Sequence, residues 1–287
     1  MRKCLFFVLA LFLLQNLSAQ KVDKGLQRQV EALIKGFNGD IGVYIKNLEN
    51  GRIVAINADT VFPTASMIKV PILVGVMDKV AKGELSLDQN LTYRDSLLYA
   101  GVDILGSFKQ DEKIALGKVA MLMLTMSDNT ASLWLQSLAG TGTRINKIMD
   151  SLGFDVTRVN SRTPGREHIR SIYGWGQTSP REMATLFERI VKGEIINKER
   201  SDAMLRMLSR NYWDDNAISQ IPADVFVASK NGAVDESRSE VLFVNGRGAR
   251  YIFCVCTKNN KDQSWKDENE AWVLTRKLSK LVWEHFE

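Results

Sequence analysis

A serine and a lysine three residues apart form the first pattern in this chain that could do chemistry. Ser66 and Lys69 would share one face of a helix at this spacing. A serine hydroxyl needs a base before it can attack a carbonyl carbon, and a partly desolvated lysine amine loses its proton more easily. The pair indicates nucleophilic catalysis, although taken alone it is more simply explained as the start of a helix.

Two further polar motifs follow Ser66 at separations of 61 and 103 residues. Residues 127–129 (Ser-Asp-Asn) lie between two segments of helical periodicity, where short polar side chains could project into a cleft or simply cap a helix. Residues 230–232 (Lys-Asn-Gly) close the β-rich run 225–229, where glycine allows a ligand to approach the backbone closely. Read alone, these three residues form a turn. In order and together, the motifs predict one polar site.

The elements that must position these residues are indicated by apolar periodicity. Helical spacing occurs at both ends of the mature chain and through most of its middle. This pattern predicts an α/β fold of the α+β kind, in which five strands and two terminal helices surround an inserted all-α domain. The predicted strands are 41–45, 53–56, 225–229, 240–244 and 251–255, and the terminal helices are 22–37 and 270–286.

The same pattern sets the expected domain boundaries. Residues 20–63 and 213–287 should form the α/β domain, and residues 64–212 the all-α domain. A capping box at 179–182, with proline at the first helical position, predicts the start of a helix. Residues 155–178 lack periodicity, and a loop of this length in a compact domain usually has a function.

Residues 1–19 have the composition of a signal peptide. Arg2 and Lys3 precede an apolar run that is too short to span a bilayer, and small residues follow it. We expect cleavage after Ala19 and export to the periplasm or the medium, with no integral membrane segment left in the mature chain.

Composition excludes several classes of protein. The chain has 287 residues, of which 45% are hydrophobic and 25% charged, as in globular proteins. Its formal charge of +5 includes Arg2 and Lys3, so the mature chain carries +3 without any run of like charges, and we expect no nucleic-acid partner. Two histidines and three cysteines argue against metal sites and a disulfide framework, so no cofactor is expected. Cys254 and Cys256 should be free, buried thiols.

The three motifs resemble the S-x-x-K, S-D-N and K-T-G set of serine enzymes that react with penicillins. The chain is similar to class A β-lactamases, within the wider family of β-lactamases and penicillin-binding proteins, over essentially its whole mature length. The resemblance implies a five-stranded antiparallel sheet with terminal helices beside an α-helical domain, and a substrate cleft between them.

The resemblance also implies a role for each motif residue. Ser66 would be the acylated nucleophile and Lys69 its base or proton relay. Ser127 would pass a proton to the leaving nitrogen, and Asn129 would bind the amide side chain of the substrate. Lys230 would lower the pKa of neighbouring amines and attract the substrate carboxylate. The remaining substrate contacts would come from Asn231, Gly232, Ala233 and Arg238, with the backbone N–H groups of Ser66 and Ala233 forming an oxyanion hole and Arg238 contacting the carboxylate.

Two positions depart from the pattern of this family. Asn231 replaces the usual Thr or Ser, which predicts altered affinity because an amide can still donate a hydrogen bond. In the segment 162–166, Thr163 stands where the family has the glutamate that activates the deacylating water. Threonine cannot do this at neutral pH. Glu167, beside His168, is either a relocated base or, like its neighbour, a solvated loop residue.

Three functions remain open on these grounds. The first is an exported β-lactam hydrolase with slow deacylation. The second is a penicillin-binding-type D,D-peptidase or esterase, and the third is a covalent β-lactam sensor that stays acylated. In each case the partner is a small β-lactam or a peptidoglycan-like acyl compound, and we expect a monomer.

Overall fold

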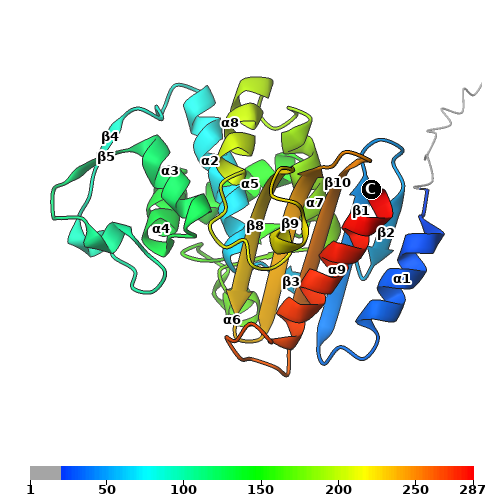
Figure 1. Cartoon of the computed structure of the whole chain (residues 1–287). Coiled ribbons are helices and arrows are strands. Elements are labelled where there is room, and N and C mark those ends of the chain that lie inside the picture. Colours follow the sequence, from blue (N-terminus) through cyan, green and yellow to red (C-terminus); the bar gives the residue numbers. More distant parts are fainter. Residues whose placement is uncertain (1–20) are drawn as a thin grey trace, which may run out of the picture.

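The computed structural model describes residues 21–287, so the predicted signal peptide lies outside the described residues. A five-stranded antiparallel sheet runs through the molecule in the order β2-β1-β10-β9-β8 (Figure 1). All five predicted strands are confirmed. Their bounds are β1 (Asp40–Asn47), β2 (Ile53–Ile56), β8 (Phe226–Val234), β9 (Ser237–Asn245) and β10 (Arg250–Lys258).

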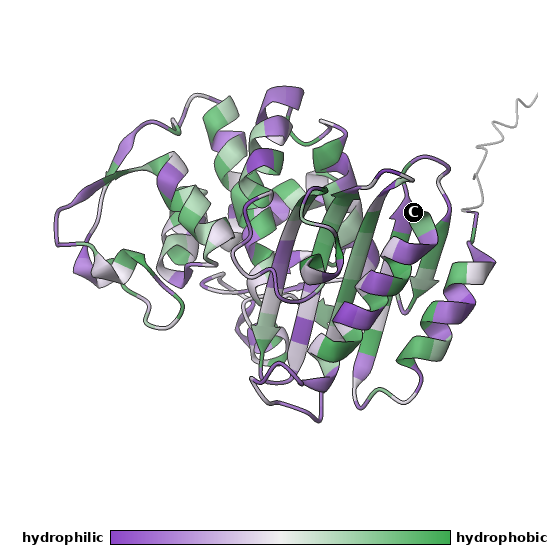
Figure 2. Ribbon diagram, in the orientation of Figure 1, coloured by the Kyte–Doolittle hydropathy of each residue, from purple (hydrophilic) through white to green (hydrophobic). Residues whose placement is uncertain are grey.

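Both terminal helices pack on one face of the sheet. α1 (Lys24–Ile34) and α9 (Glu270–Phe286) carry hydrophobic residues on one side and hydrophilic residues on the other (Figure 2). Each begins at a capping side chain that accepts a backbone hydrogen bond, as helix starts require. We call the apolar layer under these helices the outer cluster, and its members include Leu26, Val43, Phe253 and Leu278.

The helical part covers the opposite face of the sheet. α2 (Lys69–Ala81) is buried along most of its length, and α7 (Pro180–Val191) packs against β1, β9 and β10. α7 begins at the predicted capping box, where Ser179 accepts a hydrogen bond from the Glu182 N–H. The other helices of this part are α3 (Leu116–Thr125), α4 (Asn129–Leu138), α5 (Thr141–Ser151), α6 (Glu167–Tyr173) and α8 (Lys198–Leu208).

Short strands also occur within and beside the helical part, and the sequence did not predict them. β4 (Asn90–Thr92) pairs with β5 (Lys113–Ala115), which ends directly before α3 begins at Leu116. The expected loop 155–178 contains α6 and two short strands. These are β6 (Arg158–Val159) and β7 (Gly176–Thr178), which pair with each other, and β7 also pairs with β3 (Phe62–Pro63). No finding tests the boundaries at 63/64 and 212/213, which stay predictions.

The Lys-Asn-Gly segment does not form the expected turn. Residues 230–232 lie inside β8, which pairs with β9 from Phe226 to Val234, and the turn is made by residues 235–236. The expectation was wrong because pairing with β9 extends the strand beyond its apolar run. β8 is an edge strand of the sheet, which leaves its outer edge free to line a site.

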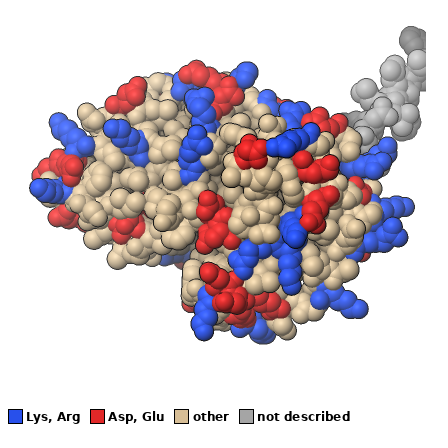
Figure 3. Space-filling model, in the orientation of Figure 1, with Lys and Arg blue, Asp and Glu red and all other residues tan. Residues whose placement is uncertain are grey.

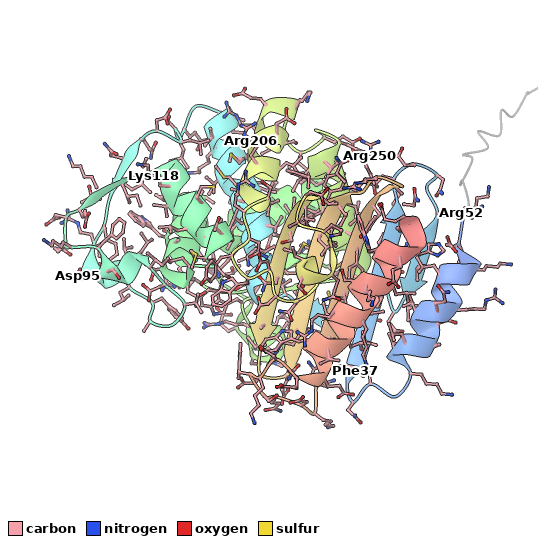
Figure 4. The ribbon with its side chains drawn as sticks, in the orientation of Figure 1. Phe37, Arg52, Asp95, Lys118, Arg206 and Arg250 are labelled. Carbon is pink, nitrogen blue, oxygen red and sulfur yellow. The ribbon has the colours of Figure 1, made fainter. Side chains whose placement is uncertain are left out.

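The sheet and the helical part occupy opposite sides of the molecule. Arg52, after β1, and Asp95, in the loop between β4 and β5, lie far apart on the two sides (Figure 4). Within residues 21–287 no helix is both long and apolar enough to cross a membrane. Cys254 and Cys256 are free and buried with their Sγ atoms 3.9 Å apart, which confirms the predicted state of both thiols.

Candidate active site

Ser66 lies in a single turn of 3-10 helix at the start of the helical part. This turn, η1 (Ala65–Ile68), is followed directly by α2, which begins at Lys69. Ala65 has a φ of 43°, a left-handed conformation that non-glycine residues rarely adopt and that is often found at functional sites. Lys69 Nζ lies 2.9 Å from Ser66 Oγ. The predicted pairing of hydroxyl and amine is therefore present.

The Lys69 amine is enclosed by hydrogen-bond acceptors. Its Nζ atom lies 2.6 Å from the Ser127 carbonyl oxygen, 3.0 Å from Ser127 Oγ and 3.0 Å from Asn129 Oδ1. Burial, and after it the charge of Lys230, hold the pKa of Lys69 well below its usual value, while Asp128 acts in the opposite direction. A neutral amine in this position can accept a proton from the Ser66 hydroxyl.

Asp128 is a fully buried carboxylate that fixes the second motif in place. Its Oδ1 atom caps α4 by accepting a hydrogen bond from the Ala131 N–H at 2.7 Å. Its Oδ2 atom accepts from the N–H groups of Ile104 and Leu105, which ties the loop before β5 to the site. Ser127, just before it, has a φ of 59°. The motif thus both caps a helix and projects a hydroxyl toward Lys69.

The third motif approaches Ser66 through a glycine. A Cβ atom at Gly232 would lie 2.4 Å from the Thr64 carbonyl oxygen and 2.7 Å from the Ser66 nitrogen, distances that side chains do not tolerate. Only glycine therefore lets β8 run this close to η1. Lys230 is fully buried, and its Nζ atom lies 3.0 Å from the Asn231 carbonyl oxygen. Burial lowers the pKa of Lys230 to about 7, and the charge of Glu240 partly opposes this.

Two cavities meet at Ser66. The first lobe has a volume of about 510 Å³, and the edge-on pair of Tyr99 and Trp175, with ring centroids 5.1 Å apart, forms part of its wall. The second lobe has a volume of about 310 Å³ and extends from Ser127 along β8 and β9 toward the start of α9. Ser66 and Ala233 line both lobes. Asn129, Ile172 and Val234 also line the first lobe, while Asn231, Gly232, Trp213 and Trp272 also line the second.

Thr163 and Glu167 are not brought to these lobes. Thr163 is buried, its Oγ1 atom donates to the Ser161 carbonyl oxygen at 2.9 Å, and its side chain packs on α5 at Gly142. Glu167 is exposed at the start of α6 and accepts a hydrogen bond from the Gly165 N–H. Neither residue lines either lobe. A base at Glu167 would require a different loop conformation.

Arg238 lines the second lobe, but its guanidinium is already engaged. The guanidinium is stacked between the Trp265 and Trp272 rings, 4.5 and 4.7 Å from their centroids. Its terminal nitrogens donate to four backbone carbonyl groups, which belong to Val234, Asp235, Ser237 and Ser264. The side chain thus clamps the β8–β9 turn to the segment before α9, in contrast to the free carboxylate contact that was expected.

Glu240 is a charged residue of the site that sequence reasoning missed, as it also missed the aromatic residues of both lobes. Glu240 is 3% exposed, lines the second lobe, and has a pKa raised by burial to about 7. The only signal in the sequence was a charged residue at the start of the apolar run 240–244. Within residues 21–287, no group of three or more His, Cys, Asp or Glu residues is placed to hold a metal ion.

This fold and this arrangement of serine, lysine and glycine motifs define a class of protein. The chain belongs to the beta-lactamase enzyme family, whose model matches residues 24–286. Among curated relatives, beta-lactamase SME-1 of Serratia marcescens is 24% identical over 89% of this chain and 88% of its own length. Beta-lactamase VEB-1 of Pseudomonas aeruginosa is 22% identical over 99% of this chain and 98% of its own.

Solved structures show the same architecture. PBP-A is 28% identical with a TM-score of 0.82, over 93% of this chain and 97% of its own. A second PBP-A structure, of a point mutant, is an acyl-enzyme complex with penicillin G. A beta-lactamase from Chitinophaga pinensis, 22% identical with a TM-score of 0.82 over 92% of this chain and its own full length, shares the fold.

Proposed function

We propose that the protein is an exported serine hydrolase that is acylated at Ser66 by β-lactams or related amides and esters and that deacylates slowly. The observation that carries the proposal is the buried Lys69 amine, 2.9 Å from Ser66 Oγ and 3.0 Å from Ser127 Oγ. One amine of lowered pKa thus links a nucleophile to a proton donor.

Acylation would proceed through two proton transfers. The neutral Lys69 amine takes the proton from Ser66 Oγ as this oxygen forms a bond to the carbonyl carbon. The backbone N–H groups of Ser66 and Ala233 hold the oxyanion of the tetrahedral intermediate. Ser127 Oγ then gives its proton to the leaving nitrogen and recovers one from Lys69 as the C–N bond breaks. The product is an ester on Ser66, with Lys69 again neutral.

Deacylation would be the slow half of the reaction. Position 163 has no carboxylate to activate water, and Thr163 itself faces α5 rather than the lobes. The loss of a general base costs about 10²–10⁴-fold in rate, which is roughly 3–5.5 kcal/mol of barrier. We therefore expect a stoichiometric burst with β-lactams followed by slow turnover.

A D,D-peptidase or esterase is the second candidate function. It is favoured by the similarity to PBP-A over nearly the whole chain, at a higher identity than the β-lactamases described above. Such an enzyme would use Ser66, Lys69 and Ser127 in the same way on a peptidoglycan-like acyl group. A protein that is acylated by β-lactams but turns over no substrate would instead be a covalent sensor.

One panel of substrates separates these functions. Intact mass after incubation with penicillin G should show a single adduct, and peptide mapping should place it on Ser66. Ser66→Ala should abolish the adduct, while Ser86→Ala, an exposed control, should not. Steady-state turnover of a chromogenic β-lactam, a D-Ala-D-Ala peptide and a simple ester then identifies the preferred substrate. An adduct on another residue would refute the proposal.

Export is the remaining part of the proposal, and it depends on the composition of residues 1–19. Expression of the full chain in a bacterium should yield a mature protein in the periplasm or the medium that begins at Gln20. The N-terminal peptide, measured by mass spectrometry, tests this expectation. A cytoplasmic product that retains Arg2 and Lys3 would contradict it.

A further inference from the structure

The second lobe is lined by tryptophans and carboxylates. Its aromatic residues are Trp213, Trp265 and Trp272, and its acidic residues are Asp215, Glu240 and Asp267. Acidic side chains gather where α9 begins, next to this lobe (Figure 3). Indole rings and carboxylates both attract positively charged groups.

Glu240 points to a ligand independently of the other carboxylates. Its Oε2 atom accepts a hydrogen bond from the Ala217 N–H at 3.1 Å, but its Oε1 atom has no hydrogen-bond partner among the described residues. The residue is more than nine-tenths buried on the wall of the lobe. A buried carboxylate oxygen without a partner is costly, and such groups are generally satisfied by a ligand, water or ion.

The cations near this lobe leave its acidic character in place. Among the described residues that line it, Arg238 is the one with a permanent positive charge, and this charge offsets one of the carboxylates although its terminal nitrogens bind neutral backbone carbonyl groups. Lys230 lies close enough to interact with Glu240, but burial lowers the pKa of this amine to about 7. The acidic side of the balance consists of the Asp215 and Asp267 carboxylates together with Glu240, whose pKa burial raises to about 7.

The position of Ser127 assigns a part of the substrate to this lobe, a step that depends on the proposed function. Ser127 lines the second lobe, whereas Asn129 lines the first. The proton from Ser127 goes to the leaving nitrogen, so the leaving portion of the substrate extends into the second lobe and the acyl portion into the first.

We propose that the second lobe is a subsite for a positively charged group on the leaving portion of the substrate, such as the side-chain ammonium of a C-terminal lysine. The ammonium lies among the carboxylates of Asp215, Glu240 and Asp267, and the Trp213 ring, which is not stacked on Arg238, covers its methylene groups.

Three peptides that differ in one side chain test this assignment by binding alone. N-acetyl-D-alanyl-D-lysine, its D-norleucine analogue and its D-glutamate analogue are titrated calorimetrically into Ser66→Ala, in which no acylation occurs. We expect the lysine peptide to bind at least about tenfold more tightly than the norleucine peptide, and the glutamate peptide to bind most weakly. The norleucine side chain keeps the stem of lysine without its charge.

Matched variants show whether the carboxylates of the second lobe cause the preference for the lysine peptide. In the same Ser66→Ala background, Asp267→Asn and Asp215→Asn should each reduce the lysine-to-norleucine affinity ratio. Asp224→Asn removes a carboxylate that is paired with Arg247 outside the lobe, and it should leave the ratio unchanged.

Each outcome separates the two proposals. Equal affinity for lysine and norleucine, or no binding of any peptide, overturns the cationic subsite. Preference for the glutamate peptide also overturns it and returns Arg238 to the role of a carboxylate contact. Penicillin labelling of Ser66 in the wild-type protein is measured separately. Its failure overturns the proposed function and the assignment of the leaving portion, while the measured preference for a cationic side chain is unaffected.

Discussion

Lys69 is the residue whose surroundings control the reactivity of Ser66. The amine is enclosed by Ser66, Ser127 and Asn129, and both burial and the charge of Lys230 favour its neutral form. Its pKa is therefore lower in the folded than in the unfolded chain. Protonation of this amine as the pH falls removes the base, so acylation should be lost on the acid side.

Removal of the Lys69 amine tests this view. Lys69→Ala should slow acylation by at least about 10²-fold, the lower end of what the loss of a general base costs. Stopped-flow measurement with a chromogenic β-lactam gives the rate, and in the wild type that rate should rise with pH and level off well below pH 10.5. Lys82→Ala, an exposed change just after α2, serves as the control. Wild-type acylation by Lys69→Ala would place the base elsewhere.

The raised pKa of Glu240 leads to a prediction about the stability of the fold. Burial raises its pKa from 4.5 to about 7, so the folded chain binds more protons than the unfolded chain between these values, and stability falls as the pH rises through them. At pH 8 the buried carboxylate costs about 3 kcal/mol. Glu240→Gln should raise the free energy of unfolding by up to this amount at pH 8 and change it little at pH 4.

Urea denaturation at the two pH values measures the effect of Glu240→Gln. Glu284→Gln, an exposed change in α9, should alter stability at neither pH. Equal stabilisation by Glu240→Gln at pH 4 and pH 8 would show that packing, rather than charge, is responsible.

Single residues differ in how far their placement in the candidate site could be predicted from the sequence. Ser66, Lys69 and Ser127 were predictable because the order and spacing of their motifs are specific. Arg238 and Glu240 were not, because their roles depend on residues far away in sequence. The stacking of Arg238 needs α9 beside β9, and the burial of Glu240 needs the segment before β8.

At the scale of elements, the contact between β8 and η1 brings together the backbone N–H groups that we propose as oxyanion donors. β8 is paired with β9 on one side only, and the turn that carries Ser66 contacts both strands. Gly232 makes this approach possible because it has no side chain between the two backbones. A change in the distance between β8 and η1 should therefore lower the rate of acylation more than it lowers the stability of the fold.

Gly232→Ala tests the contact. The added methyl group would overlap the Thr64 carbonyl oxygen and the Ser66 nitrogen, so β8 must move away from η1. We expect acylation to fall by at least about 10²-fold, the cost of losing one oxyanion donor. Gly25→Ala, which has room for a methyl group in α1, should keep full activity. Normal acylation by Gly232→Ala would show that the strand plays no part in catalysis.

The elements that were predicted correctly have strong local patterns. The five strands alternate or consist of β-branched and aromatic residues, and α7 has a capping box. α6 was missed because it is only seven residues long and has no buried residue to create a periodic stripe. The C-terminal half of β8 was missed because Asn and Gly favour turns unless a neighbouring strand supplies hydrogen bonds.

Across the whole molecule, the sheet is packed on both faces. The outer cluster lies between the sheet and the two terminal helices, and the helical part covers the other face. β1 pairs with β10 over eight residues, which joins the beginning of the described chain to its end. Because both clusters share one sheet, they should unfold in a single transition.

Leu278→Ala tests this cooperativity. Leu278 is fully buried in the outer cluster, on the face of the sheet away from Ser66, so the change should destabilise the fold by about 2–5 kcal/mol. Thermal unfolding followed by circular dichroism and the loss of penicillin labelling should move together to a lower temperature. Leu98→Ala, a change at an exposed leucine, should shift neither. Two separate transitions would contradict the expectation of one cooperative unit.

The strand order β2-β1-β10-β9-β8 has a consequence for the time at which the site forms during synthesis. A ribosome makes Ser66, Lys69 and Ser127 early, but Lys230 and Gly232 of β8 are made more than 100 residues after Ser127. The β1–β2 hairpin is made before β10, and it can join the rest of the sheet only when β10 is available to pair with β1. If Ser66 and β8 act as we propose, a nascent chain holds its nucleophile without the oxyanion donor of β8, and we expect it to become reactive only when its last strands are in place.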